Sequence, residues 1–203
     1  MADEDERLGK LLAALGDVMR SAHEKGLVEV FGGNASFRWG EGFYITPTQV
    51  PKHRLTPEDI VYVPFDLGPQ LSLSGKKASG EWRMHQSIYL NNEEVRAVLF
   101  TRNPLTLALY SSGLKADMTM LKGSEVLGKC IAEVNSFPPG SKELAEAVGV
   151  AVKECRVVVI LNQGVVFAAQ SPYRALHMAE TLEELSRITL LTNMLRGCRA
   201  LTN

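Results

Sequence analysis

The chain has 203 residues, 45% of them hydrophobic and 22% charged, and its 22 basic and 23 acidic side chains give a formal net charge of −1. This size suits one hydrophobic core, so we expect a single domain over residues 1–203. The balanced charge excludes a basic surface for nucleic acid or an anionic membrane, and the sequence has no signal-peptide or membrane-spanning pattern. We therefore expect a soluble, cytoplasmic protein.

The three cysteines, Cys130, Cys155 and Cys198, are widely spaced and form neither a CxxC pair nor a zinc-finger pattern. Cysteines of this kind behave as small hydrophobic side chains. We expect all three to be buried or half-buried residues in a reducing compartment.

The first half of the chain opens with a helical pattern and continues with short strands. Leucines recur at three- to four-residue spacing up to Met19, which predicts a helix over residues 4–25 that Gly26 can end. Ser79 is expected to cap a second helix that runs to about Leu90. Short apolar runs punctuated by glycine predict strands at residues 27–30, 36–39, 43–45 and 60–64.

The second half alternates strands and helices. Apolar periodicity predicts a strand at 95–101, a helix start at 104–111, a helix at 141–154, strands at 156–161 and 165–169, and a long helix from Pro172. Ser171 stands at the N-cap position of this last helix. Strands in pairs, with helices between them and at both ends, indicate a mixed α/β layer fold with several antiparallel strands.

Four short segments carry residue types that are suited to binding or catalysis. Backbone N–H groups and hydroxyls in glycine- and serine-rich turns bind phosphate or carboxylate. Each segment alone could be a plain turn, but their order and spacing are more specific. They are Gly33-Asn34-Ala35-Ser36, Thr46-Pro47-Thr48, Ser79-Gly80-Glu81-Trp82 and Phe100-Thr101-Arg102-Asn103-Pro104.

This order resembles the class II aldolase/adducin family, and the resemblance runs from about Leu8 to Leu195. Two further landmarks are Leu55-Thr56-Pro57-Glu58-Asp59-Ile60-Val61 and Leu161-Asn162-Gln163-Gly164. The resemblance implies a three-layer αβα sandwich with a largely antiparallel central sheet. It also implies a homo-oligomer, specifically a tetramer.

The family's enzymes use a His-Thr-His strand end and an Asn-His-Gly turn to hold Zn²⁺, which stabilises an enediolate as a Lewis acid. The corresponding residues here are Phe100, Arg102 and Gln163. Phenylalanine has no lone pair, arginine is permanently cationic, and a glutamine amide is a weak oxygen donor. We therefore expect no metal cofactor in this chain, although the resemblance implies Zn²⁺ for the family.

The four histidines of the chain do not replace these ligands. We expect His85 and His177 on helices, as satisfied or partly buried structural residues. His23 and His53 lie in polar stretches, where we expect them to be solvated.

The resemblance also implies roles for positions that are kept. It makes Glu81 an acid/base group and makes Asn34, Thr48 and Ser79 contacts of a substrate phosphate, so the expected partner is a small anionic ligand. Asn34 could equally do no more than stabilise a tight turn. Gln49 replaces the family's usual glycine, which adds bulk and alters this pocket.

Three functions remain open at this point. The first is a binding, regulatory or structural relative without catalysis. The second is a metal-independent lyase or isomerase-type enzyme in which Arg102 stabilises an oxyanion and Glu81 is the general base. The third is a sugar-phosphate aldolase whose metal site is rebuilt around Glu81. Glu81 and Arg102 could also form no more than an ion pair.

Overall fold

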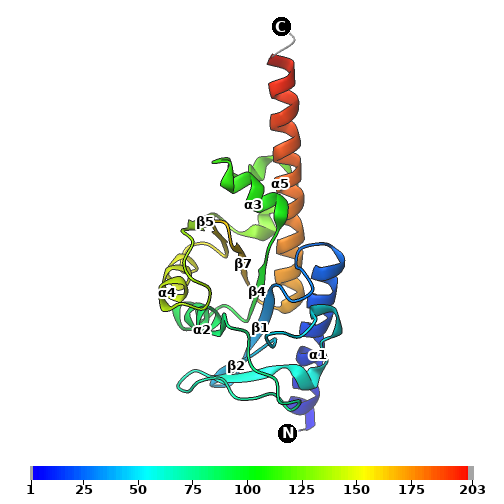
Figure 1. Ribbon diagram of the computed structural model, residues 1–203, viewed down its shortest axis with the longest axis vertical. Helices are drawn as coiled ribbons and strands as arrows, with labels where there is room; N and C mark the ends of the chain where they lie inside the picture. Colours follow the sequence, from blue (N-terminus) through cyan, green and yellow to red (C-terminus); the bar gives the residue numbers. More distant parts are fainter. Residues whose placement is uncertain (1, 201–203) are drawn as a thin grey trace.

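A single seven-stranded sheet forms the centre of the molecule, with the strand order β3-β2-β1-β4-β7-β6-β5 (Figure 1). The computed structural model describes the backbone of residues 2–200 and the side chains of residues 3–196. Neighbouring strands are antiparallel except β5 and β6, which are parallel. The strands are β1 (Asn34–Trp39), β2 (Gly42–Ile45), β3 (Val61–Pro64), β4 (Ala97–Thr101), β5 (Ile131–Val134), β6 (Val157–Ile160) and β7 (Gly164–Ala169).

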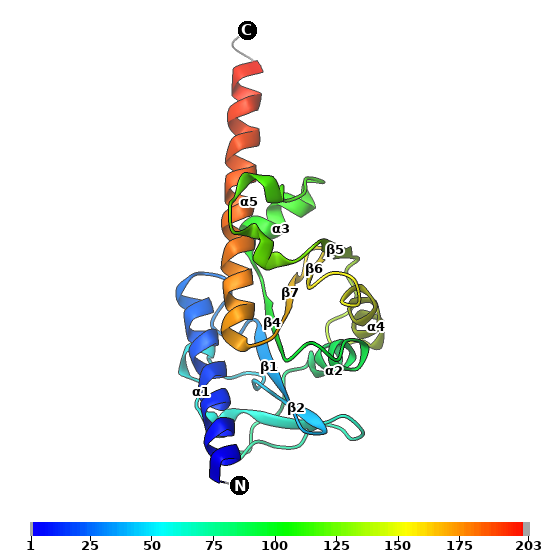
Figure 2. The same cartoon turned by 180° about the vertical axis from the view of Figure 1, so that it is seen from behind.

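Helices cover both faces of this sheet and complete the expected three layers. Helices α1 and α5 lie on one face, α2 and α4 lie on the other, and α3 packs beside α5 (Figures 1 and 2). The helices are α1 (Ala2–Glu24), α2 (Trp82–Asn91), α3 (Pro104–Ser111), α4 (Lys142–Ala151) and α5 (Pro172–Ala200). The predicted fold class, a largely antiparallel sheet in a three-layer sandwich, is therefore confirmed.

Alternation along the central strands divides the core into two halves. On β4, Leu99 faces the core shared with α1 and α5, whereas Val98 faces the core shared with α2 and α4. Phe167 and Val166 on β7 repeat this division. Successive strand residues point to opposite faces, so a sheet with apolar residues at every position requires a layer on each side.

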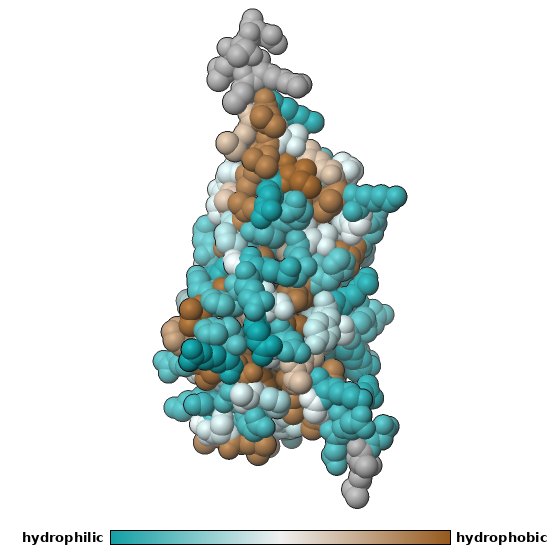
Figure 3. All heavy atoms as spheres, turned by 90° about the vertical axis from the view of Figure 1, so that its right-hand side faces the viewer, coloured by the Kyte–Doolittle hydropathy of each residue, from teal (hydrophilic) through white to brown (hydrophobic). Residues whose placement is uncertain are grey.

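The C-terminal half of α5 extends beyond the rest of the molecule (Figures 1 and 2). It carries three exposed hydrophobic side chains, Leu191, Met194 and Leu195, which are between 52% and 67% exposed. Figure 3 shows hydrophobic surface gathered at this end of the helix. Across residues 2–200 we find no helix whose length and hydrophobicity would let it cross a membrane.

Two predicted details of the secondary structure are wrong, and one strand is absent from the prediction. Residues 27–30 form no strand, because Leu27 donates its N–H to the carbonyl of Ala22 and so closes α1 at Gly26, whose φ is 71°. The N-cap of α2 is Glu81 rather than Ser79. The Oγ of Ser79 instead accepts the N–H of Glu81 at 3.3 Å, one residue before the helix begins. Strand β5 has no fully buried residue and includes the exposed Glu133, so its sequence shows no continuous apolar run.

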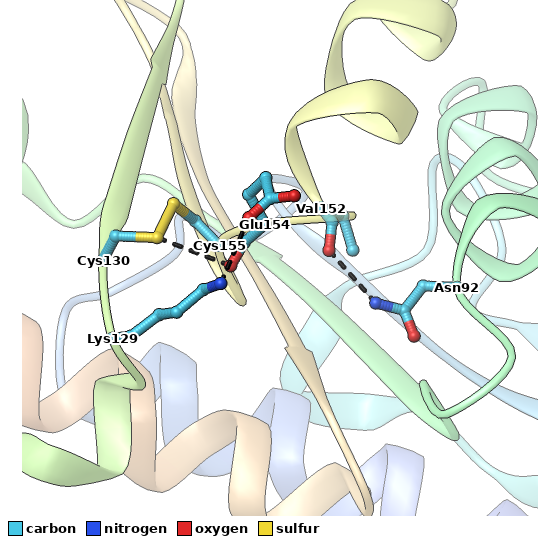
Figure 4. Close-up of a disulfide and its surroundings, with 6 residues drawn as sticks. All are labelled: Asn92, Lys129, Cys130, Val152, Glu154 and Cys155. Carbon is cyan, nitrogen blue, oxygen red and sulfur yellow. Dashed lines mark hydrogen bonds and ion pairs between the residues drawn. A yellow bond between two sulfur atoms is a disulfide. The ribbon is translucent and has the colours of Figure 1, made fainter.

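Two of the three cysteines are paired, which was not expected from the sequence, although Cys130 is half-buried and Cys155 is buried as expected. Cys130 and Cys155 form a disulfide with a Cα–Cα distance of 5.1 Å (Figure 4). Cys130 precedes β5 and Cys155 precedes β6, and the parallel pairing of Ile131 with Val157 brings the two sulfurs together. The expectation for Cys198 concerns a side chain outside the described residues.

Candidate functional site

Three hydrogen bonds, two between backbone groups and one to a side-chain hydroxyl, bring three of the four sequence segments together at one end of β1. The Oγ1 of Thr46 accepts the N–H of Ala35 at 3.1 Å, and the carbonyl of Thr46 accepts the N–H of Ser79, also at 3.1 Å. Thr48 donates its N–H to the carbonyl of Lys77. The turn that carries Asn34, the turn at Thr48 and the segment that begins α2 therefore lie next to one another, with Asn34 and Ser79 buried and Thr48 exposed.

The turn at Thr48 contains a residue with positive φ and is stabilised by a buried lysine. Gln49 has a φ of 55°, in the left-handed region that favours glycine, which fits the glycine that the family resemblance implies at this position. Beneath the turn, the amine of the buried Lys52 donates to the carbonyl of Pro47 at 2.6 Å. Burial lowers the pKa of Lys52 to about 8. The hydroxyl-bearing residue of the turn, Thr48, is exposed.

A chain of buried side chains supports Asn34 from behind. Its Oδ1 lies 2.5 Å from Nε2 of His85, and Nδ1 of the same ring lies 2.7 Å from the hydroxyl of Ser36. The hydroxyl of Tyr89 lies 2.7 Å from Ser36. Burial lowers the pKa of His85 to about 3, so the imidazole is neutral at ordinary pH.

Glu81 is a half-buried carboxylate at the start of α2. One of its oxygens, Oε2, accepts the N–H of Gly140 at 3.2 Å. Burial raises the pKa of Glu81, while the Gly140 hydrogen bond and the positive charge of Arg102 partly oppose this effect. A carboxyl group with a raised pKa beside a cation is suited to acid/base chemistry.

Arg102 lies close enough to Glu81 to influence its pKa but is bonded elsewhere. Its Nη1 donates to the carbonyl of Gln163 at 2.8 Å, and its Nε lies 3.5 Å from the carboxylate of Glu29. Within residues 3–196, Glu29 is the ion-pair partner of Arg102, so the suggested pair between Glu81 and Arg102 is wrong. The guanidinium is nearly half exposed, which leaves part of it open to a ligand.

The other two positions that the resemblance assigns to zinc ligands, Phe100 and Gln163, carry packed side chains. The ring of Phe100 lies so close to Gly164 that a Cβ on the glycine would be 2.6 Å from two ring carbons. The Nε2 of Gln163 donates to the carbonyl of Phe137, and its Oε1 is buried without a partner in the described structure. An aromatic ring, a guanidinium and one amide oxygen do not provide the donor set of a zinc site. Among residues 3–196 no cluster of three histidine, cysteine or carboxylate side chains could replace it.

The remaining histidines lie away from this site. His23 and His53 stack on each other with ring centroids 5.0 Å apart and are half-buried, so the expectation that both are solvated is wrong. His177 lies on a helix, α5, as expected, but it is exposed rather than partly buried. A hollow of about 760 Å³ also lies elsewhere, between Arg7 on α1, Arg38 on β1 and the start of α5.

Sequence reasoning misses several residues that shape the site. Glu29 forms an exposed ion pair with Arg102, and the loop from Phe137 to Gly140 contacts both Gln163 and Glu81. The Pro138-Pro139-Gly140 sequence is a turn signal from which a loop could be predicted there. No local pattern predicts that this loop lies over Glu81.

Comparison with known proteins assigns the chain to a family. A family model described as "Class II Aldolase and Adducin N-terminal domain" matches residues 13–190. The chain belongs to this family. An L-fuculose phosphate aldolase of Methanococcus maripaludis is 32% identical over 179 residues, which cover 88% of this chain and 96% of the relative. An L-fuculose phosphate aldolase of Escherichia coli K12 is 26% identical over 185 residues, which cover 90% and 84% of the two chains.

Solved structures agree with this membership of the class II aldolase family. The crystal structure of l-fuculose-1-phosphate aldolase from Thermus thermophilus matches with a TM-score of 0.78 and 28% identity. The match covers 92% of this chain and 96% of that chain. The family resemblance expected from the sequence is therefore confirmed over almost the whole chain.

Proposed function

We propose that this class II aldolase-family protein binds a small phosphorylated ligand and does not perform zinc-dependent aldol cleavage. The observation that carries the proposal is the state of the three positions that correspond to zinc histidines. Phe100 packs against Gly164. Arg102 donates to the carbonyl of Gln163 and forms an ion pair with Glu29. The amide nitrogen of Gln163 donates to the carbonyl of Phe137. The only unpaired lone-pair donor among these three side chains in the described structure is Oε1 of Gln163, and a single amide oxygen is too weak a ligand set to hold zinc.

The charge of Arg102 adds a second argument against a divalent ion at this place. Two like unit charges about 4 Å apart repel by about 1 kcal/mol in water and by about 4 kcal/mol at an effective dielectric constant of 20. A divalent ion doubles this repulsion, and the exposed carboxylate of Glu29 offsets only part of it. The same charge attracts a phosphate or a carboxylate.

The anion-binding half of the site supports the positive part of the proposal. Asn34, Thr48 and Ser79 are held together by the backbone hydrogen bonds of their segments. The amine of Lys52 lies directly beneath the turn that carries Thr48, bonded to its neighbour Pro47. An amide, two hydroxyls and a nearby cation are groups that hold phosphate.

Metal analysis and ligand titration test the two parts separately. After chelation and exposure to Zn²⁺, the purified protein is expected to retain substoichiometric zinc. The triple variant Phe100→His/Arg102→His/Gln163→His is expected to bind about one zinc per chain, because it restores three imidazole ligands. Stoichiometric, chelator-sensitive zinc in the unmodified protein would overturn the proposal.

The ligand part is tested with inorganic phosphate. Calorimetric titration should detect binding that Thr48→Val weakens by about tenfold, because one hydrogen bond to a charged group is lost. The control Thr119→Val changes an exposed threonine whose hydroxyl is bonded to Asp117, which is not a site residue, and should leave binding unchanged. Equal binding by both variants would remove Thr48 from the site.

A metal-independent lyase or isomerase is the second candidate, and the raised pKa of Glu81 favours it. In a retro-aldol step, Glu81 would accept a proton from the substrate hydroxyl as the carbon–carbon bond breaks. Arg102 would stabilise the enediolate oxygen that forms. Turnover of L-fuculose 1-phosphate in the presence of a chelator, lost in both Glu81→Gln and Arg102→Ala, would establish this activity.

The relatives named as L-fuculose phosphate aldolases suggest the third candidate, a sugar-phosphate aldolase with a rebuilt metal site. It is tested by incubation with L-fuculose 1-phosphate and Zn²⁺, Mn²⁺ or Co²⁺. Formation of dihydroxyacetone phosphate only when a metal is added would support this candidate and contradict our proposal. We expect none to form.

We infer a homo-oligomer, with a tetramer as the state that the family resemblance implies. The exposed side chains of Leu191, Met194 and Leu195 on the projecting end of α5 support a contact between chains. Light scattering should give a multiple of the 22.3 kDa chain mass. A monomer at micromolar concentration would contradict this inference.

A further inference from the structure

The side-chain amide of Asn34 can turn either its oxygen or its nitrogen toward the candidate anion site, and a neighbouring residue fixes which one. We propose that His85 is a positioning residue that holds Oδ1 of Asn34 and thereby turns its N–H₂ group toward the ligand. This inference rests on the proposed function, because it concerns the same anion site. It adds a residue that does not touch the ligand but decides the polarity of the group that does.

The atoms in contact determine which ring nitrogen of His85 carries the proton. Nε2 faces Oδ1 of Asn34 at 2.5 Å, and a carbonyl oxygen can only accept. Nε2 therefore carries the hydrogen and donates it. Nδ1 is then without a proton and accepts from the hydroxyl of Ser36 at 2.7 Å.

The direction of the next hydrogen bond, between Ser36 and Tyr89, follows from the same argument. Because Ser36 uses its hydrogen toward His85, its oxygen accepts from the hydroxyl of Tyr89 at 2.7 Å. Donation therefore runs in one direction, from Tyr89 through Ser36 and His85 to Asn34. Ser36, His85 and Tyr89 are fully buried, so water does not compete for these bonds.

The protonation states of the two titratable members keep this direction. Burial lowers the pKa of His85 to about 3, so the ring carries one proton at neutral pH. Burial also raises the pKa of Tyr89, so its hydroxyl remains a donor. A charged imidazole would donate from both nitrogens and reverse the bond to Ser36.

Because Oδ1 of Asn34 is held by His85, the amide nitrogen Nδ2 points the other way. Its Nδ2 makes no hydrogen bond to any group in the described structure, so both of its hydrogens remain available to a ligand. If the amide were reversed, Nδ2 would face the N–H of His85 and Oδ1 would face the ligand. The orientation therefore favours a phosphate monoester or inorganic phosphate over a cation or a neutral donor.

The test compares two substitutions of His85 with inorganic phosphate as the probe. In His85→Gln the side-chain amide can still donate to Oδ1 of Asn34, whereas His85→Phe fills the volume without a donor. Phosphate binding measured by calorimetry should weaken about tenfold in His85→Phe and less than about threefold in His85→Gln. The control His177→Phe, at an exposed histidine on α5, should bind phosphate as the unmodified protein does.

A spectroscopic measurement on the unmodified protein gives a second, independent readout. The ¹⁵N shifts of the His85 ring should identify the neutral tautomer with hydrogen on Nε2 at and around neutral pH. Hydrogen on Nδ1, or a charged ring at neutral pH, overturns the inference even if His85→Phe does not fold.

The titrations separate this inference from the proposed function. If the unmodified protein binds phosphate and His85→Phe binds it equally well, the role of His85 is refuted while the anion site stands. If the unmodified protein does not bind phosphate, the proposed function fails and this role fails with it. Weaker binding in His85→Phe with recovery in His85→Gln supports the inference.

Discussion

The carboxylate of Glu183 on α5 accepts the backbone N–H of Leu105 at 2.8 Å and so caps the first turn of α3. Its second oxygen accepts both the N–H and the hydroxyl of Thr106, at 3.2 and 3.0 Å. The N-cap residue of α3, Asn103, makes no side-chain cap and instead donates to the carbonyl of Ala179 on α5. Helix α3, which follows the strand end that carries Arg102, is thus held by α5 at two points near its N-terminus.

Removing the Glu183 carboxylate should destabilise the protein. Glu183→Leu leaves buried donors unpaired and is expected to lower the free energy of unfolding by about 3 kcal/mol. Glu183→Gln keeps one acceptor and should cost about 1 kcal/mol. Denaturant unfolding measures both values. The neighbouring Glu184, roughly half exposed and paired with Arg187 at 3.2 Å, is the matched control, and Glu184→Gln should change stability by less than about 0.5 kcal/mol.

The disulfide between Cys130 and Cys155 should contribute measurably to stability. It closes a loop with a sequence separation of 25, and loop-closure entropy for this length corresponds to about 3 kcal/mol. Reduction of the protein should lower its free energy of unfolding by this amount, whereas Cys130→Ser should be less stable and insensitive to reductant. A reducing cytoplasm would open the bond, so alkylation of thiols in a fresh lysate should report whether the pair is oxidised in the cell. Equal stability with and without reductant would mean that the pair is not formed.

The stability of the protein should rise with pH through the titration of Lys52. Its pKa is lowered from 10.5 to about 8, so between these values the unfolded chain binds more protons than the folded protein. The free energy of unfolding therefore increases across this interval, by about 3 kcal/mol from this group alone. Because tyrosines titrate at the upper end of this range, the measurement is the difference between the unmodified protein and Lys52→Met, which should lack the slope. Parallel stability curves for the two proteins would contradict the burial of a charged Lys52.

Replacing Gln49 should relieve strain in the turn beside Thr48. Its φ of 55° is unfavourable for a residue with a Cβ, and Gln49→Gly is expected to stabilise the protein by about 1 kcal/mol in thermal or denaturant unfolding. The control Gln70→Gly, at a loop residue without positive φ, should instead destabilise it slightly, because glycine is more flexible in the unfolded chain. Destabilisation by Gln49→Gly would show that the glutamine side chain makes a contact of its own.

The amphipathic helices are predictable because their signal is local. The leucines of α1 and the apolar stripe of α5 repeat with the helical period, and their ends carry recognisable signals at Gly26 and Ser171. Residues 27–30 show the limit of this reasoning. Their apolar run is typical of a strand, but the N–H of Leu27 is already used to close α1, and Leu27 and Val28 pack into the core from a loop.

The candidate site likewise has features that the sequence predicts and features that only the structure shows. The residue types at Phe100, Arg102 and Gln163 can be read from the sequence, and their lack of zinc-binding groups is a property of the side chains alone. The partners that these side chains contact cannot be predicted from the sequence. The sequence leaves open an ion pair between Arg102 and Glu81, whereas the structure pairs Arg102 with Glu29, because the loop after α1 passes over the end of β4.

What the order of residues alone determined is the set of periodic elements, the family to which they belong and the chemical character of the site. Each of these depends on neighbours in the chain or on side-chain identity. What only the tertiary structure decided is the pairing of partners far apart in the chain: Cys130 with Cys155, His85 with Asn34, and Glu183 with Leu105. Such pairs are separated by 25, 51 and 78 residues, and they meet only because strand pairing and helix packing place their backbones within reach.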